Sequence, residues 1–303
     1  MIRASIDIGS NSCLLLIADV DAGKIEVIED QARITSLGKG IDKTGKLSKR
    51  SMAETIVAFN DYYALIKKYG LDSTNILVTA TEASRVASNS LPFFQEIKKR
   101  FNFNVKLISG EGEAYYTSLG VCSINRSQKK QTIMDIGGGS TELIRVTGEP
   151  FNLDHFISLP LGSVRGKDWL LEGSFMKKIE EIMNSHNLET YYGEEMICVA
   201  GTMTSLGAIS LDHKEYNRTL LDNSEINFET FSQLVDSLQS FSTAELTLKY
   251  PFLGKRAETI FAGGLIGYTI GKKLGAKKLI ISTRGLRFGT VLAGEIYEHF
   301  IIK

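Results

Sequence analysis

Two short loops in this chain carry residue types that bind phosphate groups. The first, Asp7–Ser12, reads DIGSNS, and the second, Asp135–Glu142, reads DIGGGSTE. In tight turns of this kind backbone N–H groups converge on an anion, and glycine lets the backbone approach it closely. The residues expected to bind phosphate through their backbone or hydroxyl groups are Gly9, Ser10, Asn11, Ser12, Gly137, Gly138, Gly139, Ser140 and Thr141.

The two loops form an internal repeat with a constant offset, since 135 − 7 = 128 and 140 − 12 = 128. A single loop could be an ordinary glycine-rich hairpin turn with an incidental aspartate. Two loops in register, one in each half of the chain, favour a ligand whose phosphates are bound from two similar domains.

Three carboxylates belong to these loops: Asp7, Asp135 and Glu142. Carboxylates beside phosphate groups repel them unless a cation lies between, so the pattern predicts Mg²⁺ or another divalent cation bound by these residues. Neither loop has the GxxxxGK[ST] spacing of a P-loop, and no GxGxxG opens a βαβ unit, so a dinucleotide site has no support.

The loops require elements that hold them. Each lies between two β-rich runs, which predicts a strand–turn–strand hairpin at the start of each domain. Further along, hydrophobic spacing predicts alternating helices and strands. Helices are expected over 51–69, 81–87, 92–101, 111–119, 175–185, 202–209, 228–240, 256–274 and 288–300, and strands over 76–79, 105–109, 196–200 and 278–282.

A polar run at 123–130 marks the expected boundary between two domains. It gives an N-terminal domain over 1–125 with the first loop and a C-terminal domain over 126–303 with the second. A return of the last helix to the first domain is left open.

Bulk properties narrow the class of protein. The formal net charge of the 303 residues is +0, which argues against a nucleic-acid partner. Three scattered cysteines without CxxC spacing favour the cytoplasm. The apolar run around 260–270 is far shorter than the roughly 20 residues of a membrane span, so no membrane partner is expected. The oligomeric state stays open, a homodimer included.

At these loops the chain resembles the exopolyphosphatase/guanosine pentaphosphate phosphohydrolase (Ppx/GppA) family, in its short two-domain form. Further matching segments are LGKGI at 37–41, ATEASRVASN at 80–89, ISGEGEA at 108–114 and LRFG at 286–289. The resemblance implies an α/β fold of two actin/hexokinase-like (ribonuclease H-like) domains with a ligand cleft between them.

The resemblance also implies roles for individual residues. Glu113 matches the family's catalytic glutamate, the general base for water, although a glutamate in a helix's first turn also stabilises the helix dipole. Asp135 and Glu142 match acidic residues that position metal and water, and Arg85 matches an arginine that contacts phosphate. The sequence departs from the family pattern at Gly112, Thr283 and Phe288.

The expected function is release of the terminal phosphate from inorganic polyphosphate, guanosine pentaphosphate or both. Two alternatives are a small-molecule kinase of the same superfamily and a catalytically weak regulator that binds polyphosphate or an alarmone. A basic run, Lys272, Lys273, Lys277 and Lys278, is either a solvated surface or a guide for a long polyphosphate.

Overall fold

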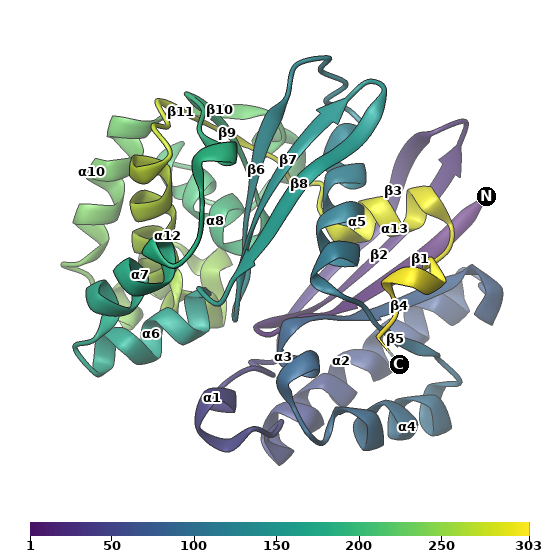
Figure 1. Cartoon of the computed structure of the whole chain (residues 1–303). Coiled ribbons are helices and arrows are strands. Elements are labelled where there is room, and N and C mark those ends of the chain that lie inside the picture. The colour runs from purple at the N-terminus through teal and green to yellow at the C-terminus, as the bar shows by residue number, and fades with distance from the viewer. Residues whose placement is uncertain (303) are drawn as a thin grey trace. The chain divides into compact units, whose positions relative to one another are not determined.

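The computed structural model describes residues 1–302, and its contacts divide the chain into two compact units (Figure 1). Unit 1 comprises Met1–Ile124 together with the segment from Gly285 onward, and unit 2 comprises Asn125–Arg284. Each unit is built on its own sheet.

The sheet of unit 1 has the strand order β3-β2-β1-β4-β5. Strands β1, β2 and β3 are antiparallel, whereas β4 and β5 run parallel to β1. The bounds of these strands are β1 Ile2–Ile8, β2 Ser12–Asp21, β3 Lys24–Ile34, β4 Ile76–Ala80 and β5 Val105–Leu107.

Helices pack on this sheet through apolar faces. In α2, Phe59 and Ile66 are buried in the core that the strands share, and Ser48 caps the helix by accepting a hydrogen bond from the Ser51 N–H. The helical segments of unit 1 are α1 Ile41–Thr44, α2 Lys49–Lys68, η1 Ser73–Asn75, α3 Glu82–Val86, α4 Ser90–Phe101, α5 Gly110–Cys122, α13 Leu286–Ala293 and η4 Glu298–Phe300.

The sheet of unit 2 repeats this arrangement. Read from β8, its order is β8-β7-β6-β9-β11, with the same strand directions as unit 1, and β10 is added at the far edge. The bounds are β6 Gln131–Ile136, β7 Thr141–Gly148, β8 Phe151–Leu159, β9 Glu195–Val199, β10 Ser224–Asn227 and β11 Lys278–Ile281. The internal repeat seen in the loops therefore extends to whole sheets.

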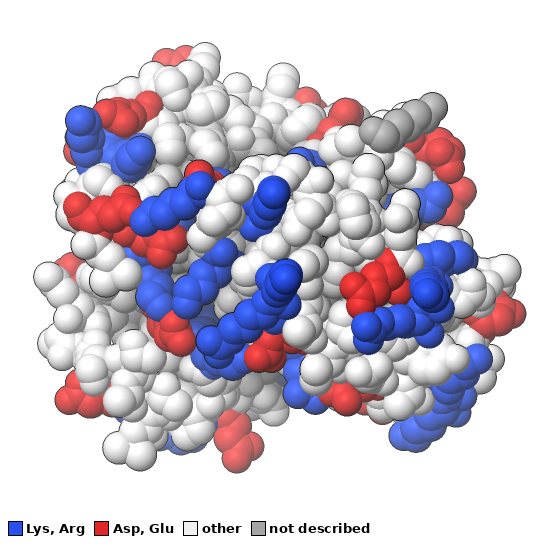
Figure 2. All heavy atoms as spheres, turned by 90° about the horizontal axis from the view of Figure 1, so that it is seen from below, with Lys and Arg blue, Asp and Glu red and all other residues white. Residues whose placement is uncertain are grey.

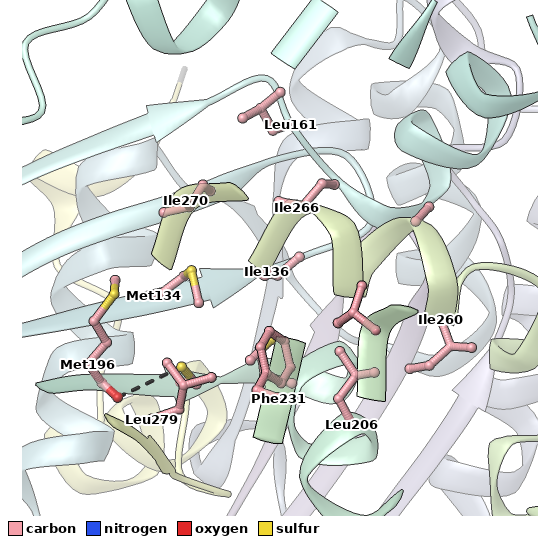
Figure 3. Close-up of a cluster of buried hydrophobic side chains, with 14 of the residues drawn as sticks. Met134, Ile136, Leu161, Met196, Leu206, Phe231, Ile260, Ile266, Ile270 and Leu279 are labelled. Carbon is pink, nitrogen blue, oxygen red and sulfur yellow. Dashed lines mark hydrogen bonds between the residues drawn. The ribbon is translucent and has the colours of Figure 1, made fainter. Parts of the chain in front are cut away.

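The core of unit 2 lies between its sheet and helices α8, α10 and α12. Figure 3 shows Met134 and Ile136 of β6 beside Ile266 and Ile270 of α12, all of them buried. The helical segments of unit 2 are α6 Ser163–Leu171, α7 Phe175–Asn184, η2 Glu189–Tyr191, α8 Ala200–Ser210, α9 Arg218–Leu221, α10 Phe228–Leu238, α11 Thr243–Lys249, η3 Pro251–Glu258 and α12 Ile260–Lys273.

The C-terminal segment differs from the sequence expectation. In place of the helix expected over 288–300 the structure has α13, which ends at Ala293 with Gly294 as a left-handed cap (φ 78°), followed by the short η4. The segment from Gly285 belongs to unit 1, not to a domain over 126–303, because Phe288 and Val291 pack against Leu16 of β2.

Other differences arise where the hydrophobic pattern is weak. The run expected as one helix over 256–274 is split, with α12 beginning only at Ile260. Helices α6 and α11 and strand β10 were not expected. In β10 only Ile226 of the four residues is buried, so it carries little strand periodicity. Between Met1 and Ile302, no helix is both long and apolar enough to cross a membrane.

Candidate active site

The two loops close with the same backbone turn. The Gly9 N–H donates to the Ser12 carbonyl oxygen at 3.0 Å, and the Gly137 N–H donates to the Ser140 carbonyl oxygen at 2.9 Å. These residues stand at the repeat offset of 128, and the turns join β1 to β2 and β6 to β7. The predicted strand–turn–strand repeat is confirmed.

The first loop is anchored by its neighbours in unit 1. The Ser10 carbonyl oxygen accepts from the Gly38 N–H at 2.7 Å, and the Asn11 carbonyl oxygen accepts from Thr35 at 3.0 Å. The Ser10 hydroxyl oxygen accepts from the Ala83 N–H of α3 at 3.2 Å, and Ser10 is 5% exposed. Ser10 therefore holds the loop against α3, while the Asn11 and Ser12 side chains remain partly exposed.

The second loop is anchored by the start of α6. The carbonyl oxygen of Gly137 accepts from the Ser163 N–H at 2.9 Å, and that of Gly139 accepts from the Arg165 guanidinium. Thr141 is buried, and its hydroxyl donates to the Leu161 carbonyl oxygen at 2.6 Å. Because the loop's carbonyls are bonded elsewhere, its backbone conformation is fixed before any ligand binds.

Asp135 and Glu142 face each other across the β6–β7 pair. Glu142 is 1% exposed, and its carboxylate accepts a hydrogen bond from the Ser158 hydroxyl at 2.7 Å. In unit 1, Asp7 occupies the position equivalent to Asp135, but its partner across the strands is Leu14. Only the second loop therefore presents a pair of carboxylates on adjacent strands.

This carboxylate pair bears on the expected metal ion. Among residues 1–302, no group of three or more histidine, cysteine, aspartate or glutamate side chains could hold a metal ion by itself. Mg²⁺ commonly takes only one or two protein carboxylates and completes its shell with water and substrate phosphates. Asp135 and Glu142 suit that kind of site.

A charged cluster in unit 1 contains the predicted base. The Arg85 guanidinium lies 2.9 Å from the Glu113 carboxylate and 3.1 Å from the Glu82 carboxylate, and it also donates to the Ile108 carbonyl oxygen at 2.9 Å. The side chains of Arg85 and Glu113 are each only 14% exposed. The structure thus brings Arg85 and Glu113 together, although they are 28 residues apart.

The electrostatics of this cluster affect the predicted base. Burial raises the pKa of the Glu113 carboxyl above its ordinary value and is the largest effect. The Arg85 cation opposes the shift, and the Glu82 carboxylate adds to it. A carboxylate with a raised pKa is a stronger proton acceptor, as general-base catalysis requires.

Sequence reasoning missed Glu82. It lies three residues before Arg85 on α3, so the two side chains share one face of the helix, and that spacing could have indicated the ion pair. Arg85, expected to contact phosphate, here contacts two carboxylates.

A second arginine in unit 2 was also missed, because it was assigned to a helical run. The Arg256 guanidinium packs against Gly201 near the start of α8, where a β-carbon on Gly201 would lie 2.8 Å from its Cζ. It donates to the Ser205 hydroxyl at 3.2 Å, and burial lowers its pKa. A partly buried guanidinium near a helix N-terminus is a favourable environment for an anion.

The departure from the family's sequence pattern at Gly112 has a structural reason. A β-carbon on Gly112 would lie 2.7 Å from the Phe300 Cβ, because η4 packs directly on this turn of α5. Phe288 is 1% exposed and fills a small apolar cluster with Leu16. Both departures therefore coincide with packing of the C-terminal segment on unit 1.

Comparison with known proteins gives a consistent assignment. The Ppx/GppA phosphatase family matches residues 16–298 of the chain. A bifunctional 3-dehydroquinate synthase/phosphatase of Fusobacterium nucleatum is 29% identical over 97% of the chain, which spans only 46% of that relative's length. Exopolyphosphatase 2 of Mycobacterium tuberculosis is 25% identical, over 96% of the chain and 97% of its own length.

Solved structures agree. The Aquifex aeolicus member of the Ppx/GppA family is 28% identical, with a TM-score of 0.78 over 97% of both chains. An exopolyphosphatase-like protein is 25% identical, with a TM-score of 0.85 over 96% of this chain and 97% of its own. The predicted α/β fold class is confirmed, with one sheet of the same strand order in each of the two units. The chain belongs to the Ppx/GppA phosphatase family.

Proposed function

We propose that this protein hydrolyses the terminal phosphoanhydride bond of inorganic polyphosphate, guanosine pentaphosphate or both. The observation that carries the proposal is the Glu113 carboxylate, which is largely buried, has a raised pKa and lies 2.9 Å from the Arg85 guanidinium. Membership of a phosphatase family and similarity to a protein named exopolyphosphatase 2 support the reaction class.

In the proposed reaction Glu113 removes a proton from a water molecule as the water oxygen attacks the terminal phosphorus. The bond between that phosphorus and the bridging oxygen breaks, and the bridging oxygen leaves with the electron pair on the shortened chain. Catalysis of this kind depends mostly on positioning and charge stabilisation, with little covalent chemistry by the protein.

Arg85 has a second task in this proposal. A phosphate group can displace a carboxylate from a guanidinium by forming two parallel hydrogen bonds with it. If substrate phosphate takes the place of Glu113 on Arg85, the cation that lowers the Glu113 pKa is partly neutralised. Substrate binding would then make Glu113 a stronger base.

The loops supply binding. Backbone N–H groups of both loops bind phosphate oxygens, with Arg256 as a further cation in unit 2. In unit 2, Asp135 and Glu142 would hold a divalent cation, which neutralises phosphate charge when bound. In unit 1, Asp7 stands at the equivalent strand end and would offer one carboxylate to such a cation.

Phosphate release tests the proposal directly. We expect release from polyphosphate or guanosine pentaphosphate with Mg²⁺, loss of release when a chelator removes divalent ions, and recovery when Mg²⁺ is returned. Tight binding with no release under any divalent metal would instead identify a regulator. ATP-dependent phosphorylation of a small molecule without phosphoanhydride hydrolysis would identify a kinase.

The pH dependence of the reaction reports on Glu113. A base must be ionised, so activity should fall as pH drops through the raised pKa of Glu113, above the usual value of about 4.3 for glutamate. Glu82→Gln removes a negative charge that raises this pKa. The acidic limb of the kcat/KM profile should then move to lower pH, by up to about one unit.

The exposed Glu111 provides the control, because it lies in the same helical turn as Glu113. Glu111→Gln should leave the acidic limb in place. A limb that does not move in Glu82→Gln, or moves upward, contradicts the assignment of that limb to Glu113.

A further inference from the structure

Two of the four lysines in the basic run considered from sequence as a guide for polyphosphate form ion pairs within the protein. Lys277 forms an ion pair with Glu194, and Lys278 lies 2.7 Å from Glu195 and 3.1 Å from Glu225. Figure 2 likewise shows basic side chains on one face lying beside acidic ones in several places. An exposed lysine therefore indicates an anion-binding surface only where no acidic side chain pairs with it.

Such a place is the segment 39–50, which we call the basic segment. It carries five basic residues and one acidic residue, a net charge of 5 − 1 = +4, within twelve positions. The chain as a whole has a net charge of +0, so this concentration is local. The basic residues are Lys39, Lys43, Lys46, Lys49 and Arg50.

Four of these cations are exposed and lack an ion-pair partner among residues 1–302: Lys39, Lys46, Lys49 and Arg50. Two of them occupy the first turn of α2, and the N-terminal end of a helix disfavours positive charge. The charge distribution thus opposes the helix dipole and repels itself in the free protein. A bound polyanion would relieve both effects.

The basic segment is held next to the first phosphate loop. Gly38, the residue before it, donates its N–H to the Ser10 carbonyl oxygen at 2.7 Å. At its far end, the Ser51 hydroxyl donates to the Ser36 carbonyl oxygen at 2.9 Å. The cations therefore stand on a fixed extension of the loop expected to bind phosphate.

The same segment is tied to the part of unit 1 that carries Arg85. The Leu47 N–H donates to the Asn89 side-chain oxygen at 2.8 Å, and the Asn89 amide donates back to the Leu47 carbonyl oxygen at 3.0 Å. The Ser88 N–H donates to the Gly45 carbonyl oxygen at 2.9 Å. Both attachment points follow α3 directly, so the basic segment borders the first loop and the Arg85 helix together.

We propose that the basic segment is a binding surface for the distal part of a long inorganic polyphosphate whose terminal phosphates occupy the first loop. This inference rests on the proposed function and adds a preference for long chains to it. No aromatic residue occurs between 39 and 50, so the stacking surface typical of single-stranded nucleic-acid sites is missing from it. Regular phosphate charges along a flexible chain match regularly spaced lysines without such a surface.

The test compares two variants with the same loss of charge. One is Lys39→Gln/Lys46→Gln/Lys49→Gln/Arg50→Gln, and the control is Lys272→Gln/Lys273→Gln/Lys277→Gln/Lys278→Gln. The measurements are kcat and KM on long-chain polyphosphate and on tripolyphosphate over a series of salt concentrations. Direct binding of fluorescently labelled long-chain polyphosphate is measured in parallel.

We expect the first variant to raise KM for long chains about tenfold at low salt. The slope of log binding constant against log salt concentration should fall in magnitude by up to about four. Its kinetics on tripolyphosphate and the behaviour of the control variant should change less than about twofold. Equal KM and equal binding in the two variants would overturn the inference. So would tighter binding of single-stranded nucleic acid than of polyphosphate at the basic segment.

The two proposals fail in different ways. If the unsubstituted protein releases no phosphate, the proposed function fails, and the binding measurement still decides whether the basic segment holds polyphosphate. If it releases phosphate and the first variant keeps the chain-length preference, only the inference about the basic segment fails.

Discussion

Replacing Glu113 by glutamine is expected to lower turnover of polyphosphate about 10²- to 10⁴-fold, the usual contribution of a general base. Glutamine keeps the length of the side chain and an oxygen that can accept from Arg85, but it cannot take the proton of the attacking water. Glu82 still neutralises the guanidinium in the variant. Binding of polyphosphate should therefore stay within about threefold of the unsubstituted protein, since the base acts in the transition state.

The matched control is Glu111→Gln, which removes an exposed carboxylate from the same turn of α5. Steady-state kinetics should show less than about a twofold change in kcat for this variant, as for most exposed substitutions. Thermal unfolding of both variants separates loss of chemistry from loss of structure. Full turnover by a folded Glu113→Gln protein would remove Glu113 from the role of base.

Local sequence was sufficient to predict the two loops. Glycine at 9 and 137, flanked by β-rich runs, specifies a tight turn between strands, and both turns close with the same hydrogen bond. The prediction succeeded because a hairpin depends on residues close in sequence. Its placement at the start of each sheet also follows from the repeat.

The Arg85 cluster could be predicted only in part. Arg85 follows β4 and Glu113 follows β5, and these strands are parallel neighbours, so their carboxyl ends bring the two residues to one edge. The sequence predicted the strands but not their order in the sheet. Without the order, the ion pair with Glu113 and the contribution of Glu82 to its pKa could not be derived.

The C-terminal segment that packs on unit 1 shows a different limit of prediction from sequence. Periodicity predicts that residues near 288 form a helix, but not which unit buries its apolar face. Here Phe288 and Val291 complete a cluster on β2 of unit 1. Long-range packing of this kind depends on complementary shapes that one sequence segment does not contain.

The same C-terminal segment also packs against α5, the helix that carries Glu113. This contact gives the second large expected effect. Helices α5 and α13 pack closely, and a β-carbon on Gly289 would lie 2.6 Å from the carbonyl carbon and 2.9 Å from the Cα of Tyr116. Backbone atoms cannot move aside as a flexible side chain can. Gly289→Ala should therefore destabilise the protein by about 3 kcal/mol or more, measured by chemical denaturation.

Tyr116 lies one turn after Glu113 on α5, so the displaced helix should also move the base. Activity of the folded fraction of Gly289→Ala is expected to fall, since small misplacements of a catalytic group are costly. Gly285→Ala is the matched control on the same segment, because no atom lies within 4 Å of its added β-carbon and its φ of −118° suits alanine. If the two variants unfold at the same denaturant concentration, the close α5–α13 contact does not stabilise unit 1. If Gly289→Ala loses stability but each folded molecule keeps full turnover, α13 supports the fold without positioning Glu113.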